Sequence, residues 1–343
     1  MSAAVLATPA PSRVLIVIPT LNEIAHIGPL LERLVAEAAE LGGHVVVADG
    51  GSTDGTIVTA KEYAHQHGCV TLLHNPWRIQ SAAMNLAVER FGDGCGYVIR
   101  IDAHGGYPVD YCAALIREAE ATTADSVVVP MTTIGTGLFQ RAVATAQNAV
   151  VGTGGSSHRT GKGGKWVDHG HHALMRIDAY RQVGGYDESF RHNEDAELDY
   201  RLTAAGRRIW LTGATQMIYH PRATPAALFR QYFGYGSGRA RNILKHRAIP
   251  KARQVLPLVI APAVALAALS FVNWMAMVPF LGWSLLCLSM GAMAAARHEK
   301  DYGLPMSRAP LVGIAAMIMH FAWSAGFWVH VASSFGGGGQ QTR

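Results

Sequence analysis

The sequence predicts an α/β fold, a mostly parallel sheet covered by helices, followed by a C-terminal transmembrane helical anchor. Short β-branched runs alternate with helical patterns in the first half, at the spacing of βαβ units. The stretch Val255–Ala296 then runs 42 residues without a charged side chain. Charge divides the same way: from Arg239 onward there are 10 basic and 2 acidic residues, against 19 and 22 before it. At 343 residues the chain is long enough for two domains.

The first half contains four predicted strands with helices between them. The β-branched runs predict strands over Val14–Ile18, Val45–Val47, Val70–Leu73 and Tyr97–Ile101. Apolar spacing and capping residues predict a helix ending at Gly42-Gly43, one from Ser52–Asp54 to Ala64, and one over Ser81–Phe91. Ligands bind outside the carboxyl ends of the strands in such sheets, and Asp49 and Asp102 each directly follow a strand.

The apolar tail is too long for one membrane span. Forty-two helical residues extend roughly 63 Å, about twice the ~30 Å hydrocarbon core, so we expect two spans with a turn between Asn273 and Pro279. The uncharged stretch Ala309–Phe335 predicts a third. The aromatic and basic residues before the spans suit an interfacial segment, in which Gly234, Gly236 and Gly238 argue against one continuous helix. The predicted organisation is a flexible N-terminus 1–12, an α/β domain 13–228, an interfacial segment 229–254, three transmembrane helices 255–335 and a short tail 336–343.

The basic residues also predict an orientation. They precede the first span and fill the Arg297–Arg308 loop, which places the α/β domain in the cytoplasm and the C-terminus outside, in a multi-pass protein of the inner (plasma) membrane. The α/β part is mildly acidic, which disfavours nucleic acid as a partner. The four cysteines are far apart, so neither disulfides nor a thiolate zinc site are expected.

The segment Asp102-Ala103-His104 is a candidate metal site. Side chains at i and i+2 of a strand point to one face, so a carboxylate and an imidazole here could chelate one divalent cation. Substrate phosphates and water would complete the shell, as is usual for Mg²⁺ and Mn²⁺. The alternative is an ordinary strand-end turn with a capping aspartate and an incidental histidine.

Three further segments carry polar groups where a ligand would lie. The first, Ile18–Glu23, brings Pro19, Thr20 and Glu23 after a strand, and the second, Val47–Thr56, joins Asp49 to glycines that allow close approach. In the third, Gly184–Phe190 precedes His192–Leu198, where paired acids at a helix start could place one carboxylate to accept a proton. Each alone could equally be loop and helix-cap chemistry.

In this order the four segments resemble the inverting family 2 glycosyltransferases with the GT-A fold, over about residues 12–222. The resemblance implies that Asp195 of the Glu194-Asp195 pair is the catalytic base and that Asp102 and His104 bind Mn²⁺ or Mg²⁺, with His220 as a further residue near the metal. It implies a nucleotide-sugar site formed by Pro19, Thr20, Glu23, Asp49, Arg78, Asn85 and Asp102. His104 is a departure, because the family has an aspartate there; an imidazole favours manganese somewhat.

Two segments and the tail narrow the resemblance. The chain resembles the succinoglycan-type exopolysaccharide glucosyltransferases in the segments Arg100–His104 and Val167–Ala173 and in its three predicted spans. This implies transfer of glucose from UDP-glucose, in β-linkage, onto a polyprenyl-diphosphate-linked sugar, with membrane lipids and an exopolysaccharide assembly complex as partners. His171, His172 and Tyr186 would shape the acceptor pocket. A zinc cluster of His169, His171 and His172 is disfavoured because adjacent histidines point to different faces.

Two alternatives stay open at the level of sequence. A polyprenyl-phosphate sugar synthase would use an ionised lipid phosphate as acceptor and need no base, whereas Glu194-Asp195 offers one. A catalytically inactive scaffold of a membrane glycan complex would not need Asp49, Asp102 and Asp195 together. In either case the Gly-rich segment Gly152–Lys165 is long enough to be a mobile lid over the donor.

Overall fold

The computed structural model describes residues 13–156, 159, 163–250 and 252–336. The predicted flexible N-terminus 1–12, residues 337–343 of the predicted tail and part of the predicted lid lie outside the described residues. The chain forms two compact units, which we describe separately. The first comprises residues 1–129, 163–189 and 198–216, and the second comprises 130–162, 190–197 and 217–343.

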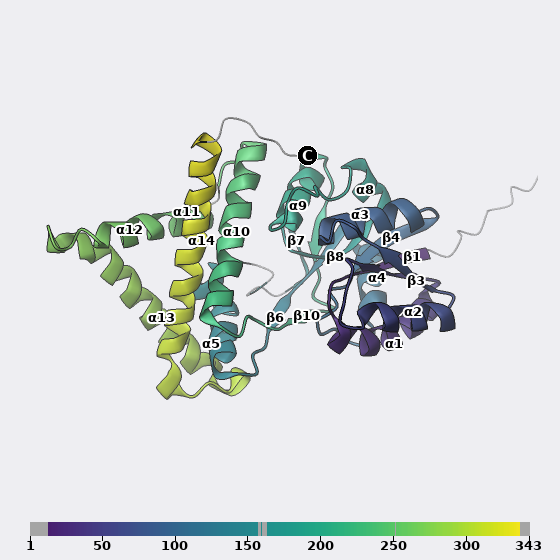
Figure 1. The fold of residues 1–343 in the computed structure, drawn as a ribbon, viewed down its shortest axis with the longest axis horizontal. Helices are drawn as coiled ribbons and strands as arrows, with labels where there is room; N and C mark the ends of the chain where they lie inside the picture. The colour runs from purple at the N-terminus through teal and green to yellow at the C-terminus, as the bar shows by residue number, and fades with distance from the viewer. Residues whose placement is uncertain (1–12, 157–158, 160–162, 251, 337–343) are drawn as a thin grey trace, which may run out of the picture. The chain divides into compact units, whose positions relative to one another are not determined.

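The first unit is built on a mostly parallel sheet whose eight described strands have the order β3-β2-β1-β4-β8-β5-β9-β7 (Figure 1). β8 runs antiparallel to both of its neighbours, and β7 runs antiparallel to β9. This confirms the predicted α/β architecture. The strands are β1 (Arg13–Thr20), β2 (His44–Asp49), β3 (Val70–His74), β4 (Cys95–Arg100), β5 (Ser126–Val129), β7 (Lys165–Val167), β8 (His171–Arg176) and β9 (Ile209–Leu211).

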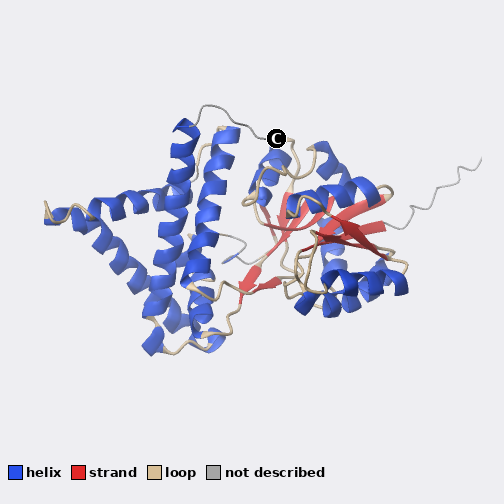
Figure 2. Cartoon of the chain, in the orientation of Figure 1, coloured by secondary structure: helices blue, strands red, loops and turns tan. Residues whose placement is uncertain are grey.

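Helices cover both faces of this sheet, which explains why its central strands are continuously apolar (Figure 2). One face carries α1 (Ile24–Leu41), α2 (Thr56–Gln66) and α4 (Tyr111–Thr122). The other carries α3 (Gln80–Phe91), α8 (Ile177–Gln182) and the later turns of α9 (Glu194–Ala204). Leu198 and Leu202 of α9 are buried there with Met84 of α3 and Val17 of β1.

β1 continues through Pro19, although the sequence predicts that it stops there. Its pairing with β4 reaches only Val17, opposite Arg100, whereas its pairing with β2 continues to Thr20, opposite Asp49. Pro19 therefore lies where β1 has one strand neighbour, and a residue without an N–H is tolerated at such a position. The extension brings Thr20 level with Asp49.

Among its described residues, the second unit is helical apart from a parallel pair of strands, β6 (Met131–Thr133) and β10 (Met217–Tyr219). Small and aliphatic side chains of α5, α10, α13 and α14 form its core, among them Ala142, Leu228, Ala295 and Val312. Its helical segments are α5 (Leu138–Gln147), α6 (Val150–Thr153), α10 (Pro225–His246), α11 (Ala252–Val255), η1 (Leu256–Val259), α12 (Ile260–Ala267), η2 (Trp274–Met277), α13 (Val278–Tyr302), η3 (Met306–Arg308) and α14 (Pro310–Gly336).

α10 is one continuous helix, so the expectation of a break at its glycines was wrong. Thr224 caps its first turn by accepting a hydrogen bond from the Ala227 amide, and Pro225 starts the helix. Gly236 lies directly against the carbonyl oxygen of Trp323 on α14, where a Cβ would overlap that oxygen. Tertiary packing therefore offsets the low helix propensity of glycine.

Two described segments are long and apolar enough to cross a membrane, Trp274–His298 and Met306–Phe335. The remaining apolar helix, Leu256–Ala267, is about 18 Å long, which is short of the ~30 Å hydrocarbon core. The chain between it and Val278 turns over residues 268–277, where the sequence predicts a turn. The structure thus contains two candidate spans in place of the three expected.

Candidate active site

Asp49, at the carboxyl end of β2, organises the loop that follows it. Its Oδ1 accepts hydrogen bonds from the amides of Gly51 (2.7 Å) and Ser52 (2.8 Å). Its Oδ2 accepts from the hydroxyls of Ser52 (2.6 Å) and Thr20 (3.1 Å). The side chain is 1% exposed, and these four bonds use the positions at which a carboxylate accepts. Asp49 can contact a nucleotide only if one of these donors gives way.

The loops after β1 and β4 meet through Glu23 and His104. The Glu23 carboxylate lies 2.9 Å from Nδ1 of His104, whose side chain is about half exposed. Asp102 and His104 do not continue the strand, because β4 ends at Arg100 and the Gly105 amide donates to the Asp102 carbonyl, closing a turn. The strand alternation used to predict this pair is therefore wrong, although both side chains remain at this end of the sheet.

A buried arginine organises the surroundings of Asp102. Nε of Arg100 lies 3.3 Å from Oδ1 of Asp102, and its Nη2 lies 3.3 Å from Nδ1 of His171. Nε2 of His171 in turn lies 3.6 Å from Oδ2 of Asp102. A buried guanidinium requires partners on several sides, and here it fixes the orientation of the carboxylate. No role for Arg100 was predicted from the sequence. An arginine at the end of an otherwise apolar strand could have indicated a buried charge with acidic partners nearby.

The chain of hydrogen bonds continues from Arg100 into the interior. Nη1 of Arg100 donates to the Tyr186 hydroxyl (3.3 Å), which lies 2.7 Å from Nδ1 of His172. Nε2 of His172 lies 2.6 Å from Oδ1 of Asp199 on α9. Both ring nitrogens of His172 are thus engaged, one by the Tyr186 hydroxyl and the other by the Asp199 carboxylate. They connect the carboxyl end of β4 with α9.

Asp199 is a second residue of this hydrogen-bonded network, after Arg100, that could not be recognised from the motifs in the sequence. Nδ1 of His169 lies 2.7 Å from its Oδ2. Burial opposes its ionisation, but the attraction of His172 and the hydrogen bonds from His169 and His172 outweigh burial and lower the pKa of Asp199. The available signal was its spacing, four residues after Asp195 and therefore one turn along the same helix.

The residues expected to line the acceptor pocket are mostly internal. His172 is fully buried and Tyr186 is 3% exposed. Since both are bonded within the network, neither side chain presents a group to an acceptor. His171 is partly exposed and faces Asp102. The structure thus assigns His172 and Tyr186 to the support of the site.

Asn85 also supports the site from the interior. Its Nδ2 donates to the Tyr186 carbonyl and to Glu188 (both 2.9 Å), and its Oδ1 accepts from the Tyr186 amide (2.9 Å) and the Tyr180 hydroxyl (2.5 Å). All its hydrogen-bonding groups are occupied, so the expected nucleotide contact is not available. Gly185 has a φ of 70°, and a Cβ there would meet Oδ1 of Asn85 at 2.5 Å. Glycine is therefore required at this turn.

The donor groups at the end of the sheet suit a cation held partly by substrate. Among the described residues there is no group of three or more His, Cys, Asp or Glu that could hold a metal ion. Mg²⁺ and Mn²⁺ commonly take one or two protein ligands, with substrate phosphates completing the shell. The carboxylate of Asp102 and the imidazole of His104, supported by Glu23, fit that requirement.

The Glu194-Asp195 pair belongs to the second unit, in the first turn of α9. The turn before it is held against α10: Nδ2 of the Asn193 side chain donates to the Tyr235 carbonyl (2.7 Å), and a Cβ on Gly238 would overlap the His192 carbonyl oxygen. Glu197, in the same first turn of α9, is buried, with Lys245 Nζ at 2.6 Å and His246 Nε2 at 3.0 Å. Glycines of α10 thus allow the close approach that positions the acidic turn.

Three other predicted features are resolved in part. His220, in the second unit, donates from Nδ1 to the Ile134 carbonyl (3.1 Å). Arg78 is exposed, and its backbone packs on Gly50 with a left-handed φ of 59°. Of the predicted lid, the described ends are α6 and β7, and β7 pairs with β9. The nucleotide role of Arg78, the metal role of His220 and the lid stay predictions.

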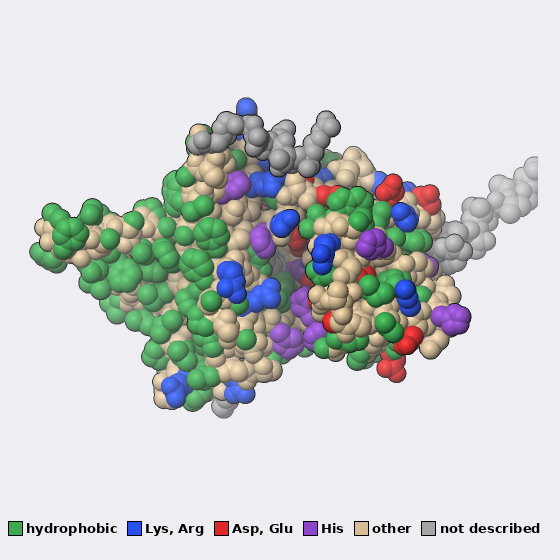
Figure 3. All heavy atoms as spheres, in the orientation of Figure 1, with side chains coloured by type: hydrophobic (Ala, Val, Ile, Leu, Met, Phe, Trp, Pro, Cys, Tyr) green, Lys and Arg blue, Asp and Glu red, His purple; other side chains and the backbone are tan. Residues whose placement is uncertain are grey.

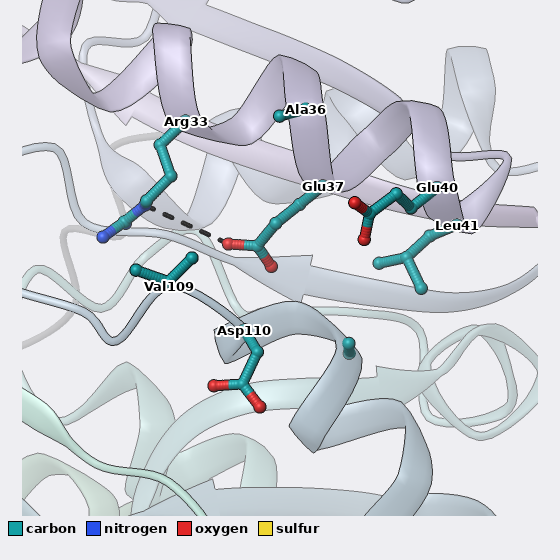
Figure 4. A pocket seen from close by; sticks show the side chains of 8 residues that line it. Arg33, Ala36, Glu37, Glu40, Leu41, Val109 and Asp110 are labelled. Carbon is teal, nitrogen blue, oxygen red and sulfur yellow. Dashed lines mark ion pairs between the residues drawn. The ribbon is translucent and has the colours of Figure 1, made fainter.

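A small cavity of about 140 Å³ lies between α1 and the start of α4 in the first unit (Figure 4). The Arg33 Nε and a Glu37 oxygen are 4.0 Å apart at its wall, and burial raises the pKa of Glu37. No residue predicted from the sequence to be catalytic, metal-binding or nucleotide-binding lines it. The candidate active site is therefore the polar cluster at the strand ends.

Comparisons with known proteins identify the family of the chain. A family model for glycosyl transferase family 2 matches residues 15–184, which contain Asp49, Asp102 and His104. The chain is 58% identical over 314 residues to the succinoglycan biosynthesis protein ExoA of Rhizobium meliloti (strain 1021), covering 92% of this chain and 93% of that protein.

Two solved structures share the fold. The mannosyltransferase PcManGT from Pyrobaculum calidifontis, in complex with GDP-Man and Mn²⁺, has a TM-score of 0.52 and 19% identity over 95% of this chain and 91% of its own. GalNAc-T7, with UDP, GalNAc and Mn²⁺, has a TM-score of 0.50 and 13% identity over 67% and 48%. The sheet, its strand-end cluster and the near full-length relative lead to one conclusion: the chain belongs to glycosyl transferase family 2, as a nucleotide-sugar-dependent enzyme of the GT-A fold.

Proposed function

We propose that the protein is a membrane-attached inverting hexosyltransferase of exopolysaccharide biosynthesis. It transfers glucose from UDP-glucose, in β-linkage, onto a polyprenyl-diphosphate-linked sugar. The observation that carries the proposal is the 58% identity to a succinoglycan biosynthesis protein, because the match covers 92% of this chain. It therefore includes the helical second unit as well as the fold that many glycosyltransferases share.

The strand ends of the first unit supply the donor site in this proposal. Asp102 and His104 hold a divalent cation, which when bound neutralises charge on the departing diphosphate. Arg100 keeps the Asp102 carboxylate oriented, and Glu23 does the same for His104. The imidazole of His104 favours Mn²⁺. The Mn²⁺ and nucleotides in the GalNAc-T7 and PcManGT structures support this role for the fold.

Asp195 acts as the base in the transfer. It takes the proton from the acceptor hydroxyl while that oxygen bonds to the anomeric carbon, and the bond from this carbon to the UDP oxygen breaks on the opposite face. A single in-line displacement inverts an α-linked donor to a β-linked product. General-base catalysis of this kind contributes about 10²–10⁴-fold in rate.

The apolar helices of the second unit support a reaction at a membrane surface. Two segments have the length and composition of membrane spans, and basic residues flank them. We propose that the nucleotide-sugar site faces the cytoplasm, beside the lipid-linked acceptor. Basic side chains of the segment 229–254 would meet anionic headgroups.

The proposal is tested with membranes that contain the full chain. They are incubated with UDP-glucose, UDP-galactose or UDP-N-acetylglucosamine, with a galactosyl-diphosphate lipid or a polyprenyl phosphate as acceptor, and with Mn²⁺, Mg²⁺ or chelator. We expect glucosylated diphosphate lipid in the presence of Mn²⁺. A product formed only from polyprenyl phosphate would establish the synthase alternative instead.

Matched variants test the residue assignments. Asp195→Asn should lower the transfer rate by about 10²–10⁴-fold, whereas Asp93→Asn, the same change at a largely exposed carboxylate paired with Arg181, should leave it unchanged. Wild-type rates from Asp195→Asn would refute the base. Full activity in chelator would refute the metal site at Asp102 and His104.

A further inference from the structure

The two candidate membrane spans differ in what they pack against. Of the apolar window in Trp274–His298 only 11% is buried inside the structure, against 50% for Met306–Phe335. The second segment includes most of α14, whose apolar window is half covered by protein, and the first includes most of α13, whose apolar window is almost uncovered. Two helices that differ this much in burial need not share one environment.

α14 lies beside α10 and parallel to it within the second unit (Figure 1). The rings of Phe229 and Phe321 are 6.1 Å apart, Gly326 lies against the Phe233 backbone, and Ser237 Oγ lies 3.3 Å from Nδ1 of His330. From the first of these contacts to the last, the residue number rises by 8 on α10 (Phe229 to Ser237) and by 9 on α14 (Phe321 to His330). The two helices thus run alongside each other for more than two turns. Along this length they must lie at the same depth relative to any bilayer.

α10 is not a membrane-spanning helix, because it is charged along its length. It carries Arg230, Arg239, Arg241 and Lys245. Arg241 lies over the Phe190 ring (4.6 Å to its centre), and Lys245 bonds Glu197 of the acidic turn. If α14 stood across a bilayer, α10 and this polar turn would be drawn into the hydrocarbon with it, which is costly for charged side chains.

The hairpin of α12 and α13 has the opposite character. Its tip exposes Phe271 (84%), Val272 (75%), Trp274 (73%) and Met275 (60%). Figure 3 shows hydrophobic side chains covering the visible face of this part of the second unit. α13 meets α14 near Trp283, whose Nε1 donates to His320 (3.3 Å), and at Gly291 against Gly313, so the tip extends beyond these contacts. Arg253 precedes the hairpin and Arg297 follows its apolar stretch, which favours one side of the membrane for both ends.

We propose that only the α12–α13 hairpin enters the bilayer, while α14 lies along the membrane surface beside α10. The C-terminal end of α14 then remains on the same side as α10 and the acidic turn of α9. This revises the external C-terminus expected from the sequence. That this side is the cytoplasm rests on the proposed function, whereas the shared side rests only on the packing of α10 and α14.

Cysteine labelling in cells tests the shared side. Phe335→Cys reports the end of α14, and Lys61→Cys on the exposed surface of α2 reports the first unit; the unsubstituted chain gives the background of the native cysteines. With a membrane-impermeant maleimide we expect both variants to react only after permeabilisation. Reaction of Phe335→Cys alone in intact cells would overturn the proposal. Reaction of both in intact cells would support the shared side and refute the cytoplasmic location.

A matched pair of charge insertions tests which helix is in lipid. Leu285 on α13 and Val329 on α14 are both exposed apolar side chains (67% and 55%). Leu285→Lys should shift protein from the membrane pellet to the supernatant after alkaline carbonate washing, and Val329→Lys should leave it in the pellet, because a lysine at the membrane surface stays hydrated. Equal release by both variants would overturn the proposal.

Discussion

In the first unit acidic side chains are held by other side chains, whereas in the second the residues just before the acidic turn are held by the close approach of a helix. Asp199 and Asp102 are oriented by His172 and Arg100 through short hydrogen bonds in the interior. The turn before Glu194 instead packs on glycines of α10, and its Asn193 side chain donates to a backbone carbonyl. The first arrangement depends on charge and tautomer, and the second depends on shape.

The difference indicates a division of work between the units. In the function proposed above, the network of hydrogen-bonded side chains would hold the donor end of the site against the charge of a diphosphate. The turn packed on α10 would link the position of Asp195 to the helices proposed to meet lipid. Changes in charge should therefore disturb the first unit most, and changes in volume should disturb the second.

The largest expected effect is that of Asp199→Asn. It removes the anion that His169 and His172 surround, and loss of one partner of a buried pair costs about 3–5 kcal/mol. Since the folded pKa of Asp199 lies below its unfolded value of about 3.9, its contribution is present above that pH and is lost as pH falls through the folded value. The melting temperatures of the two proteins, measured from pH 7 down to pH 3, should approach each other only below about pH 3.9. A difference in melting temperature that stays constant over the whole pH range would contradict an ionised Asp199 in the folded protein.

Gly238→Val tests whether close packing on α10 positions the turn before Glu194 in the second unit. The new side chain overlaps the His192 carbonyl, and overpacking of this kind costs about 1–3 kcal/mol or displaces the turn. We expect a fall in transfer rate with UDP binding to the first unit unchanged, measured by titration with UDP. Gly282→Val, where a Cβ meets no atom within 4 Å, is the control. Loss of UDP binding would show that the hydrogen-bonded network of the first unit depends on the packing of the turn on α10 in the second unit.

Tyr186→Phe sharpens the description of the first unit. It removes the hydroxyl between Arg100 and His172 and leaves a buried acceptor unsatisfied, at a cost of about 1–3 kcal/mol. The apparent Mn²⁺ affinity should weaken, because Arg100 loses a partner that fixes it against Asp102. Tyr63→Phe on α2, outside the network, should change neither the free energy of unfolding nor the apparent Mn²⁺ affinity. Unchanged Mn²⁺ affinity in Tyr186→Phe would separate the network from the metal site.

The smallest expected effect is that of His104→Asp, which changes ligand type and not packing, because the side chain is about half exposed. A second carboxylate suits Mg²⁺ better than an imidazole does. The ratio of transfer rates with Mn²⁺ and Mg²⁺ should fall by about a few-fold. A constant ratio would indicate that His104 does not contact the metal.

Much of the fold could be predicted from local pattern. The strands over residues 14–101 lie where β-branched runs predict them, because a strand covered on both faces must be apolar throughout. The role of Asn85 could not be predicted, since its partners at Tyr186 and Glu188 are about a hundred residues away. The continuity of α10 was missed because glycine propensity is local and its compensation by Trp323 is not.

The sequence by itself determined the alternation of strands and helices, the acidic and histidine side chains that follow the strands, and the apolar tail, because each depends on neighbouring residues. Only the tertiary structure decided that His172 and Tyr186 are internal supports, that Arg100 connects Asp102 to Asp199, and that α14 follows α10. These depend on which distant surfaces meet. Hydrogen-bond geometry and close backbone contact act over a few ångströms, so composition and spacing along the chain do not specify them.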